Sequence, residues 1–394
     1  MEVNKKPQRK PQFKKQLPIK IVSYESTNDY KAKTYKEIIN FREELNKMNS
    51  VGIDKTILSN IIIESIDLNK LMAQPSNKRS VQLSNTTTGY PVIDTVSQET
   101  ILLDTLTIKD NGLFNNFKLN YKLNRGHKTY YTILDLTVSN NEGHNLKPYT
   151  YTEYLEHLGR IRLYLIENYG ITINVSEAKF KSIEINNTQQ MDQPFQEYLP
   201  ILEAIEPFIS KKRFTHRLEV RRVNQQPDTV YFRNNQMTLK FYNKSNQLQE
   251  LSFTCEDNLL RIEYTLTNKG VSRQLKSNKI ADINQNTIAT FFNESLFTDL
   301  VEPFNKAINS SNTKVTKLYH TVKKQKQRGA FREFIHRLNA SDILIDSLQL
   351  YDIATYELKH DTHKSRHKKI MEDLLNPKYQ NVLNKFHELI DKFL

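Results

Sequence analysis

The chain has 394 residues, with 57 Lys and Arg against 44 Asp and Glu, which gives a formal net charge of +13. That balance excludes an acidic solvating protein, and a hydrophobic content of 38% excludes disorder over the full length. The excess positive charge favours a polyanionic partner, most often nucleic acid, with general solubility as the alternative. Because single cores stop growing beyond about 250 to 300 residues, the length predicts two or three cooperating units.

The cysteine content and the hydropathy of the sequence indicate the cellular compartment. Cys255 is the sole cysteine, so an intramolecular disulfide and a cysteine-rich zinc site are excluded. No apolar run approaches the roughly 18 residues of a membrane helix, and the Lys-, Gln- and Pro-rich start lacks the apolar segment of a signal peptide. We therefore expect a soluble protein in a reducing cytoplasm, without a membrane partner.

The first 90 residues divide into two predicted segments. Residues 1–20 carry seven Lys and Arg against Glu2 alone, which predicts a basic disordered arm over 1–30. Within 31–90, apolar residues at three-to-four spacing predict two amphipathic helices, TYKEIINFREELNKMN and KTILSNIIIESIDLNKLM. A polar linker over 73–89 follows them.

The segment 91–280 has a different pattern. Short runs rich in Thr, Tyr, Ile and Val alternate in polarity and predict successive strands, with a hairpin between TVYF and MTLKFY. Two helices interrupt them: one over 151–169, opened by a capping box at Thr150 and Glu153, and one over 195–208. We expect an α+β fold, in which two or more helices pack on a central, mostly antiparallel sheet, with a helical N-terminal segment and an all-α C-terminal region over 281–394.

The strongest basic block outside the arm lies in this C-terminal region. Eight basic residues fall between Lys314 and Arg337, against Glu333 alone. Helical spacing can place several on one face against a DNA backbone; a solvated helix face is the alternative. The candidate DNA-binding residues are Lys323, Lys324, Lys326, Arg328 and Arg332.

Several common catalytic patterns are missing. The chain has no phosphate-binding loop, and nine glycines leave little room for a nucleotide cradle, so an ATPase is not expected. No two histidines stand two positions apart, which excludes the histidine metal clamp of many single-strand nicking enzymes. His360, His363 and His367 have zinc-ligand spacing, but the surrounding lysines and arginines would repel a dication.

The informative constellation lies on predicted strands. In MTLKFYNK, alternation sends Lys240 and Tyr242 to the face opposite Leu239 and Phe241. Glu263 in LLRIEYTL and Glu184 in KFKSIEIN also fall on polar faces. If these strands are neighbours, the four polar residues share a surface. The alternative is that they are ordinary solvent-facing or cross-strand partners.

That residue set suits metal-assisted phosphoryl transfer to a tyrosine. Carboxylates bind hard dications such as Mg²⁺ or Mn²⁺, which polarise a phosphate. A phenol with a pKa near 10 is only about 0.1% ionised at neutral pH, a deficit of roughly 4 kcal/mol that a lysine and a metal can offset.

At these residues the chain resembles a known family. The run TVYFRNNQMTLKFYNKSNQL followed by LLRIEYTL resembles the signature of the gene II-type replication initiators of filamentous phages and related plasmid initiators, in which a Tyr-x-Lys strand precedes an Arg-x-Glu strand. The segment around His144 is similar to the family's Gly-His-Asn segment, and KFKSIEIN to its strand with an acidic residue. The resemblance covers about residues 129–274.

The resemblance implies rolling-circle initiation at a double-stranded origin, with one strand nicked by a tyrosine that becomes linked to the 5′ phosphate at a single-stranded nick site. It implies Tyr242 as nucleophile and Lys244 as its partner. It further implies Glu263 and Glu184 as ligands of Mg²⁺ or Mn²⁺. The related plasmid initiators have a glutamate where this chain has Gln247. Its amide oxygen can still coordinate a metal, without a charge, or Glu250 or Glu219 can substitute as a third carboxylate. Lys240 and His144 are additional candidate site residues.

Other interpretations stay open. The chain can instead be a non-catalytic regulator that binds an origin or operator, a conjugative relaxase, or an RNA-binding protein whose exposed aromatics stack on bases. Beyond DNA, a host replication helicase and a second copy of the chain are candidate partners.

Overall fold

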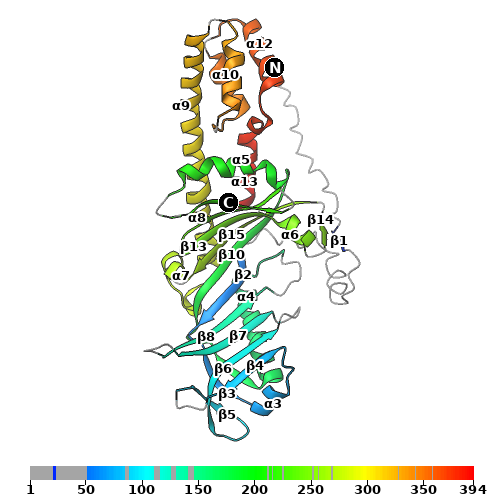
Figure 1. Ribbon diagram of the computed structural model, residues 1–394, viewed down its shortest axis with the longest axis vertical. Coiled ribbons are helices and arrows are strands. Elements are labelled where there is room, and N and C mark those ends of the chain that lie inside the picture. Colours follow the sequence, from blue (N-terminus) through cyan, green and yellow to red (C-terminus); the bar gives the residue numbers. More distant parts are fainter. Residues whose placement is uncertain are drawn as a thin grey trace, which may run out of the picture.

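The computed structural model describes residues 21–23, 51–84, 88–110, 116–125, 130–140, 146–210, 213–214, 216–223, 226–250, 253–255, 257–267, 269–326, 328–341, 343–356 and 358–394. The fold is α+β, as the sequence predicts. A large twisted sheet forms the body, and helices extend from one end of it (Figure 1). None of the described helices combines the length and the apolar character that crossing a bilayer requires.

The main sheet has 13 strands in the order β11-β12-β13-β15-β10-β2-β8-β7-β6-β5-β3-β9, with β4 paired to β6. The pairings are antiparallel except for β3 with β5. The bounds are β2 Gly52–Ser59, β3 Ile62–Ile66, β4 Arg79–Leu83, β5 Tyr90–Asp94, β6 Thr100–Asp110, β7 Phe117–Arg125, β8 Tyr130–Ser139, β9 Ile171–Asn174, β10 Lys179–Met191, β11 His216–Val223, β12 Gln226–Arg233, β13 Met237–Asn243 and β15 Asn258–Thr267. A second, two-stranded sheet pairs β1 (Ile21–Ser23) with β14 (Phe253–Cys255).

The predicted helix over 55–72 is wrong for most of its length. Residues 52–66 form β2 and β3, and only α3 (Leu68–Ala73) is helical. Seven of the fifteen residues from Gly52 to Ile66 are β-branched, which favours strands over helix. Asn60, with φ of 58°, breaks the segment and redirects the chain between two parts of the sheet.

Two further N-terminal predictions have different outcomes. The predicted linker over 73–89 contains β4, which pairs with β6, so the main sheet begins well before residue 91. The predicted arm over 1–30 lies outside the described residues apart from β1, and the first predicted helix lies wholly outside them.

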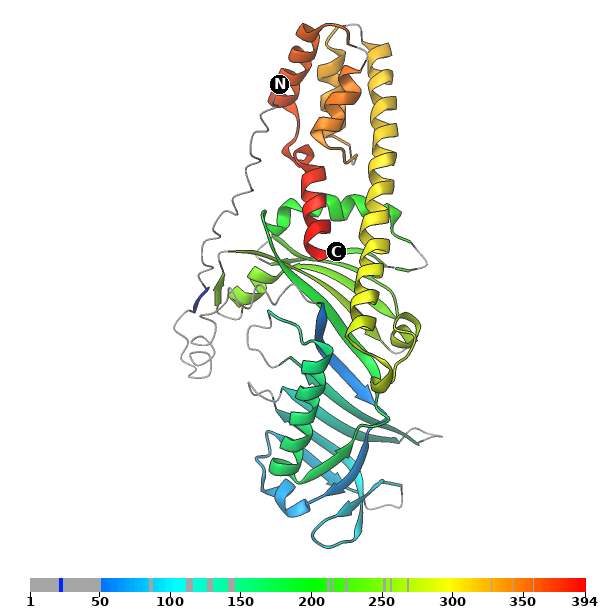
Figure 2. The same ribbon diagram turned by 180° about the vertical axis from the view of Figure 1, so that it is seen from behind.

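The prediction for the helix after residue 150 is confirmed. Helix α4 (Tyr151–Tyr164) continues through a π-helical turn, η2 (Leu165–Tyr169), and ends at Gly170 with φ of 65°. The capping box is complete, because the Thr150 side chain accepts from the Glu153 backbone amide and the Glu153 carboxylate accepts from the Thr150 amide. Helix α4 covers one face of the sheet (Figure 2), and its Tyr154 hydroxyl lies 2.9 Å from the Thr56 hydroxyl on β2.

The other predicted elements of the middle segment also form. The predicted second helix becomes η3 (Phe195–Glu197), α5 (Leu199–Ile205) and η4 (Glu206–Phe208). The predicted hairpin joins β12 to β13, where the Asn234 side-chain oxygen accepts from the Gln236 and Met237 amides at 2.6 and 2.7 Å. Two short helices follow β13 and β15: α6 (Lys244–Glu250) and α7 (Lys269–Gln274).

Beyond residue 280 the described chain is helical. The bounds are η5 Ile280–Asp282, α8 Gln285–Leu296, η6 Phe297–Val301, α9 Glu302–Gln325, α10 Ala330–Asn339, α11 Ser347–Thr355, α12 Asp361–Leu374, η7 Pro377–Tyr379 and α13 Val382–Phe393. Helix α9 leads away from the sheet, and α10, α11 and α12 pack around its far half on a separate apolar core (Figure 1). Helix α13 returns to the main core, where Phe386 stacks on Phe304 with ring centroids 3.5 Å apart.

Candidate metal and tyrosine site

The candidate site lies on one face of four neighbouring strands: β13, β15, β10 and β2. Opposite Glu263 on β15 stand Lys240 on β13 and Asn186 on β10. Tyr242 stands opposite Arg261 on β15, one ladder step away. Directly opposed residues of antiparallel strands project from the same face, and residues two apart on a strand do so as well. The register therefore brings Tyr242, Lys240, Glu263 and Glu184 to one surface.

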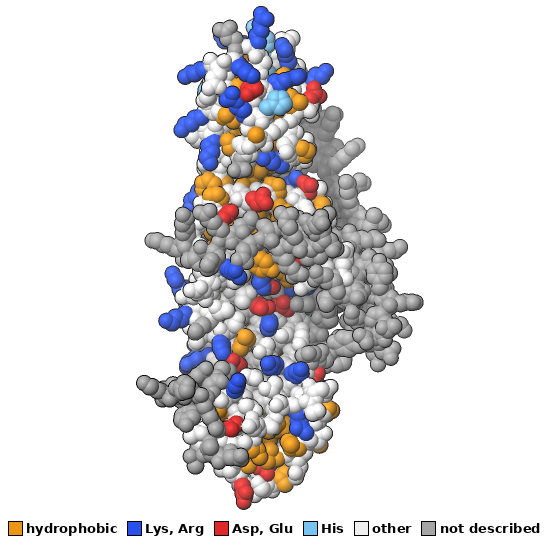
Figure 3. All heavy atoms as spheres, viewed as in Figure 1, with side chains coloured by type: hydrophobic (Ala, Val, Ile, Leu, Met, Phe, Trp, Pro, Cys, Tyr) orange, Lys and Arg blue, Asp and Glu red, His pale blue; other side chains and the backbone are white. Residues whose placement is uncertain are grey.

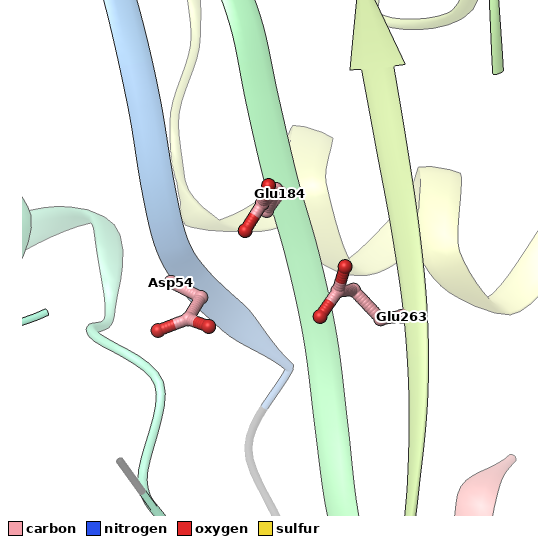
Figure 4. A group of neighbouring side chains, drawn as sticks. All are labelled: Asp54, Glu184 and Glu263. Atoms are coloured by element: carbon pink, nitrogen blue, oxygen red, sulfur yellow. The ribbon is translucent and has the colours of Figure 1, made fainter. Parts of the chain in front are cut away.

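Three carboxylates converge at the centre of this face. One oxygen from each of Asp54, Glu184 and Glu263 lies within 4.8 Å of the other two. Figure 4 shows the three side chains reaching toward a shared space from β2, β10 and β15. Oxygen donors at this spacing match the ligand set that a hard dication such as Mg²⁺ or Mn²⁺ takes. Within the described part of the chain, this is the one group of three or more acidic, His or Cys side chains with such geometry.

Asp54 was missed by the sequence analysis. It immediately precedes the stretch that was interpreted as a helix, and it sits at an irregularity in the β2–β10 ladder. Lys55 pairs with Glu184 and Ile53 pairs with Ile185, which leaves Asp54 between them. Bulges of this kind re-aim a side chain. The available signal was an aspartate within a β-branched segment.

The electrostatics of the cluster favour a bound cation. Burial, followed by the charges of Glu263 and Asp54, raises the pKa of Glu184 from 4.5 to about 7. In the metal-free site, ionisation of the third carboxylate is therefore unfavourable. A bound dication would stabilise the ionised form. Two cationic side chains already compensate in part: Lys240 Nζ lies 2.5 Å from a Glu263 oxygen, and Arg261 Nη1 lies 3.5 Å from an Asp54 oxygen.

Arg261 is the rigid support of the site. Its side chain is fully buried, and its Nε donates to the Thr188 hydroxyl at 2.7 Å. Its Nη2 donates to the carbonyl oxygen of Leu146 at 3.1 Å, which ties the segment ahead of α4 to the sheet. Because the guanidinium is fixed on three sides, its charge is held between Asp54 and Tyr242.

Tyr242 is half-buried, and its ring centroid lies 6.0 Å from the Arg261 guanidinium carbon. Burial raises the pKa of its phenol well above 10, and the charge of Arg261 acts in the opposite direction. The charges of Glu263 and Asp54 also act on this phenol. Tyr242 is thus within electrostatic reach of the carboxylate cluster, and a cation nearby would favour its phenolate.

Lys244 follows at the first turn of α6 and is fully buried. Burial, followed by the charge of Arg261, lowers the pKa of its amine well below 10.5. Its Nζ donates to the Gln247 side-chain oxygen at 2.7 Å. A buried amine with a lowered pKa gives up its proton more readily than the amine of a lysine at the surface, and is then able to accept one.

The other sequence candidates have mixed outcomes. The Gln247 oxygen is engaged by Lys244, and the third carboxylate of the cluster is Asp54. His144 lies outside the described residues, as do the side chains of Glu219 and Glu250. The competing tyrosines differ: the Tyr264 hydroxyl donates to Asp299 at 3.0 Å on the opposite face of the sheet, whereas Tyr231 stands opposite Lys240 on the site face.

The basic block lies far from this site, on the helical end of the molecule. Lys and Arg side chains are scattered over that end of the face in Figure 3. Lys323, Lys326, Arg328 and Arg332 line a cavity of about 960 Å³ between α9, α10 and α12; Lys324 is exposed beside it. Lys326 also pairs with Glu333 at 3.0 Å. His363 and His367 line the same cavity, where His367 stacks on Phe331 with ring centroids 3.9 Å apart.

Comparisons with known proteins add little to this geometry. No protein-family model and no curated protein matches the sequence. One solved structure, of a rolling circle replication initiator protein from Geobacillus stearothermophilus, is similar over 64% of this chain and 85% of that chain, at 12% identity and a TM-score of 0.32. A similarity at this level assigns no function, so the proposal below is based on the site.

The raised pKa of Glu184 predicts a pH dependence of stability in the metal-free protein. Between pH 4.5 and about 7 the folded state keeps a proton that the unfolded chain has released. The contribution to stability is therefore complete below pH 4.5 and is lost as the pH rises through 7. We expect the free energy of unfolding, measured by urea titration in the presence of a chelator, to fall over this range.

A Glu184→Gln variant should lose this fall, because its side chain does not ionise. Glu177→Gln, at an exposed position just ahead of the same strand, is the matched control and should keep the wild-type pH profile. Identical profiles for Glu184→Gln and the wild type would show that Glu184 does not carry the effect.

Proposed function

We propose that this protein nicks and rejoins one strand of DNA at a replication origin through a covalent phosphotyrosine intermediate, and so initiates rolling-circle replication. The observation that carries the proposal is the placement of Tyr242 beside Asp54, Glu184 and Glu263 on one face of the sheet. A tyrosine next to three carboxylates that can hold a dication suits the transfer of a phosphodiester to a phenol.

In the proposed cleavage step, Tyr242 is the nucleophile, Lys244 transfers the proton and Arg261 stabilises negative charge. The Tyr242 oxygen attacks the phosphorus, a phosphorus–oxygen bond to tyrosine forms, and the bond to the 3′ oxygen breaks. Lys244, whose buried amine has a lowered pKa, takes the phenolic proton, and its ammonium form can return a proton to the leaving oxygen. Arg261, fixed beside Tyr242, stabilises negative charge on the phenolate. A 3′ hydroxyl is left as primer, and the reverse steps rejoin the strand.

The three carboxylates would hold Mg²⁺ or Mn²⁺, which supplies Lewis-acid polarisation of the scissile phosphate when bound. Lys240 competes for Glu263 in the absence of a metal and can turn to the phosphate once that carboxylate is occupied.

The remainder of the chain would bind the origin. We propose that the sheet domain carries the nicking site, and that the basic arm over 1–30 and the helical region over 281–394 add DNA contacts. The cationic cavity between α9, α10 and α12 supports this division, because it places Lys323, Arg328 and Arg332 together at an exposed end of the molecule.

The nucleophile is tested by Tyr242→Phe, which removes one oxygen from a strand residue and leaves its packing largely unchanged. We expect strand cleavage of supercoiled origin DNA with Mn²⁺ to fall by at least about a thousandfold, since no covalent intermediate can form. Affinity for the origin should change less than about twofold, because binding depends on contacts elsewhere. Tyr231→Phe, on the neighbouring strand and the same face, is the control and should retain cleavage.

Two results would contradict this assignment. One is undiminished nicking by Tyr242→Phe. The other is a trapped DNA–peptide adduct that mass spectrometry maps to Tyr231. Origin binding by the wild type without any open-circle product would instead favour a non-catalytic regulator.

The DNA contacts of the helical region are tested by salt dependence. Changing Lys323, Lys324 and Lys326 to Gln should reduce the slope of log affinity against log salt by about 2. Each lysine that contacts a phosphate contributes roughly 0.9 to this slope. We expect less than the full contribution of three lysines because Lys326 is already paired with Glu333. The control changes Lys70, Lys78 and Lys306 to Gln, which removes the same charge at exposed positions outside the basic block. An equal slope in both triple variants would show that the block is a solvated surface.

A further inference from the structure

Asn186 is an unusual residue in the middle of β10. Its side chain is fully buried, yet neither Oδ1 nor Nδ2 forms a hydrogen bond with any residue that the structure describes. Leaving a buried polar group unsatisfied destabilises a protein, so buried amides almost always have partners. The next residue, Asn187, follows that rule: its side-chain oxygen accepts from the Gln189 amide at 3.0 Å. Both polar atoms of the Asn186 amide therefore lack a partner that the fold normally provides.

The strand register directs Asn186 to the carboxylate cluster. It stands opposite Glu263 on β15 and opposite Gly52 on β2, two residues before Asp54. Glu184 lies two residues earlier on its own strand and so on the same face. Side chains in directly opposed pairs have Cβ atoms about 4.5–5.5 Å apart. Asn186 thus stands directly opposite Glu263, two residues from Glu184 on the same strand, and diagonally across from Asp54.

On the side of β10 away from Glu263, the segment that contains Pro148 and Tyr149 packs closely on Gly52, the β2 residue opposite Asn186. At Gly52 a Cβ atom would lie 2.4 Å from the Tyr149 carbonyl oxygen and 2.9 Å from the Pro148 Cβ, so this approach requires glycine. The Ile53 amide donates to that same Tyr149 oxygen at 2.7 Å, which holds the covering segment in place. This segment therefore covers β2 at the position opposite Asn186, and the carboxylate cluster lies on the other side.

We propose that the side-chain oxygen of Asn186 is a fourth protein ligand of the dication held by Asp54, Glu184 and Glu263. This inference rests on the metal site of the proposed function. An amide oxygen is a suitable donor for Mg²⁺ or Mn²⁺ and brings no charge. A fourth carboxylate would add to the repulsion among three that already share one buried space, whereas the amide completes the ligand set without doing so.

The test measures binding of Mn²⁺ alone to the full chain by titration calorimetry, together with the melting temperature with and without the metal. In Asn186→Leu we expect Mn²⁺ affinity to fall by at least about tenfold, comparable to the loss of other groups that support a metal centre. The metal-free melting temperature should be unchanged or higher, because an unsatisfied buried amide is replaced by an apolar group of similar shape. The rise in melting temperature on adding Mn²⁺ should shrink.

A second variant shifts every quantity the other way. Asn186→Asp adds a fourth buried carboxylate, so the metal-free protein should melt at a lower temperature, and Mn²⁺ should bind more tightly and raise the melting temperature by more than in the wild type. Asn187→Leu is the matched control. It breaks the bond to Gln189 and should lower the melting temperature, but Mn²⁺ affinity should stay within about twofold of the wild type, because Asn187 projects from the other face.

The proposal is overturned if Asn186→Leu binds Mn²⁺ with wild-type affinity, in which case the amide binds only an ordered water. Failure of this inference is distinguishable from failure of the proposed function. Wild-type nicking together with unchanged Mn²⁺ affinity in Asn186→Leu removes the fourth ligand and leaves the nicking enzyme intact. Absence of Mn²⁺ binding in the wild type removes the metal site and this inference together.

Discussion

Mutual repulsion among three carboxylates in one partly buried space is the constraint on which the rest of the site depends. Asp54, Glu184 and Glu263 come from three different strands, so the register of the sheet enforces their proximity. Like charges at this distance cannot all persist without compensation. The surrounding side chains provide it: Lys240 pairs with Glu263, Arg261 approaches Asp54, and the pKa of Glu184 rises until its carboxyl holds a proton near neutral pH.

The same burial acts on the reactive groups and makes them dependent on one another. It raises the pKa of the Tyr242 phenol and lowers that of the Lys244 amine, so the charged forms of both residues are disfavoured. A cation in the carboxylate cluster would favour the Tyr242 phenolate, whereas a phosphate beside Tyr242 would favour the protonated form of Lys244. In the proposed reaction, activation of Tyr242 would therefore depend on metal and DNA together.

The sequence predicted the parts of the site that depend on local periodicity. Strand alternation alone was enough to place Lys240 and Tyr242 on one face of their strand and Leu239 and Phe241 on the other face. This period of two does not depend on distant contacts. The capping box at Thr150 was likewise a local pattern. Asp54 escaped because its strand is defined by pairing with β10 and β8, whereas the isoleucine spacing just after it also fits a helix. Asn186 was not predicted as a site residue for a related reason. What distinguishes it is a buried side chain without a hydrogen-bond partner among the described residues, and only the packed structure reveals this.

The central claim is that a dication binds among Asp54, Glu184 and Glu263, beside Tyr242. The most direct measurement is anomalous X-ray diffraction at the manganese absorption edge, from crystals of the full chain grown with Mn²⁺. The account predicts one strong anomalous peak within coordination distance of an oxygen from each of the three carboxylates. A peak located elsewhere, for example among His360, His363 and His367, or a carboxylate cluster without any peak at saturating Mn²⁺, would contradict it.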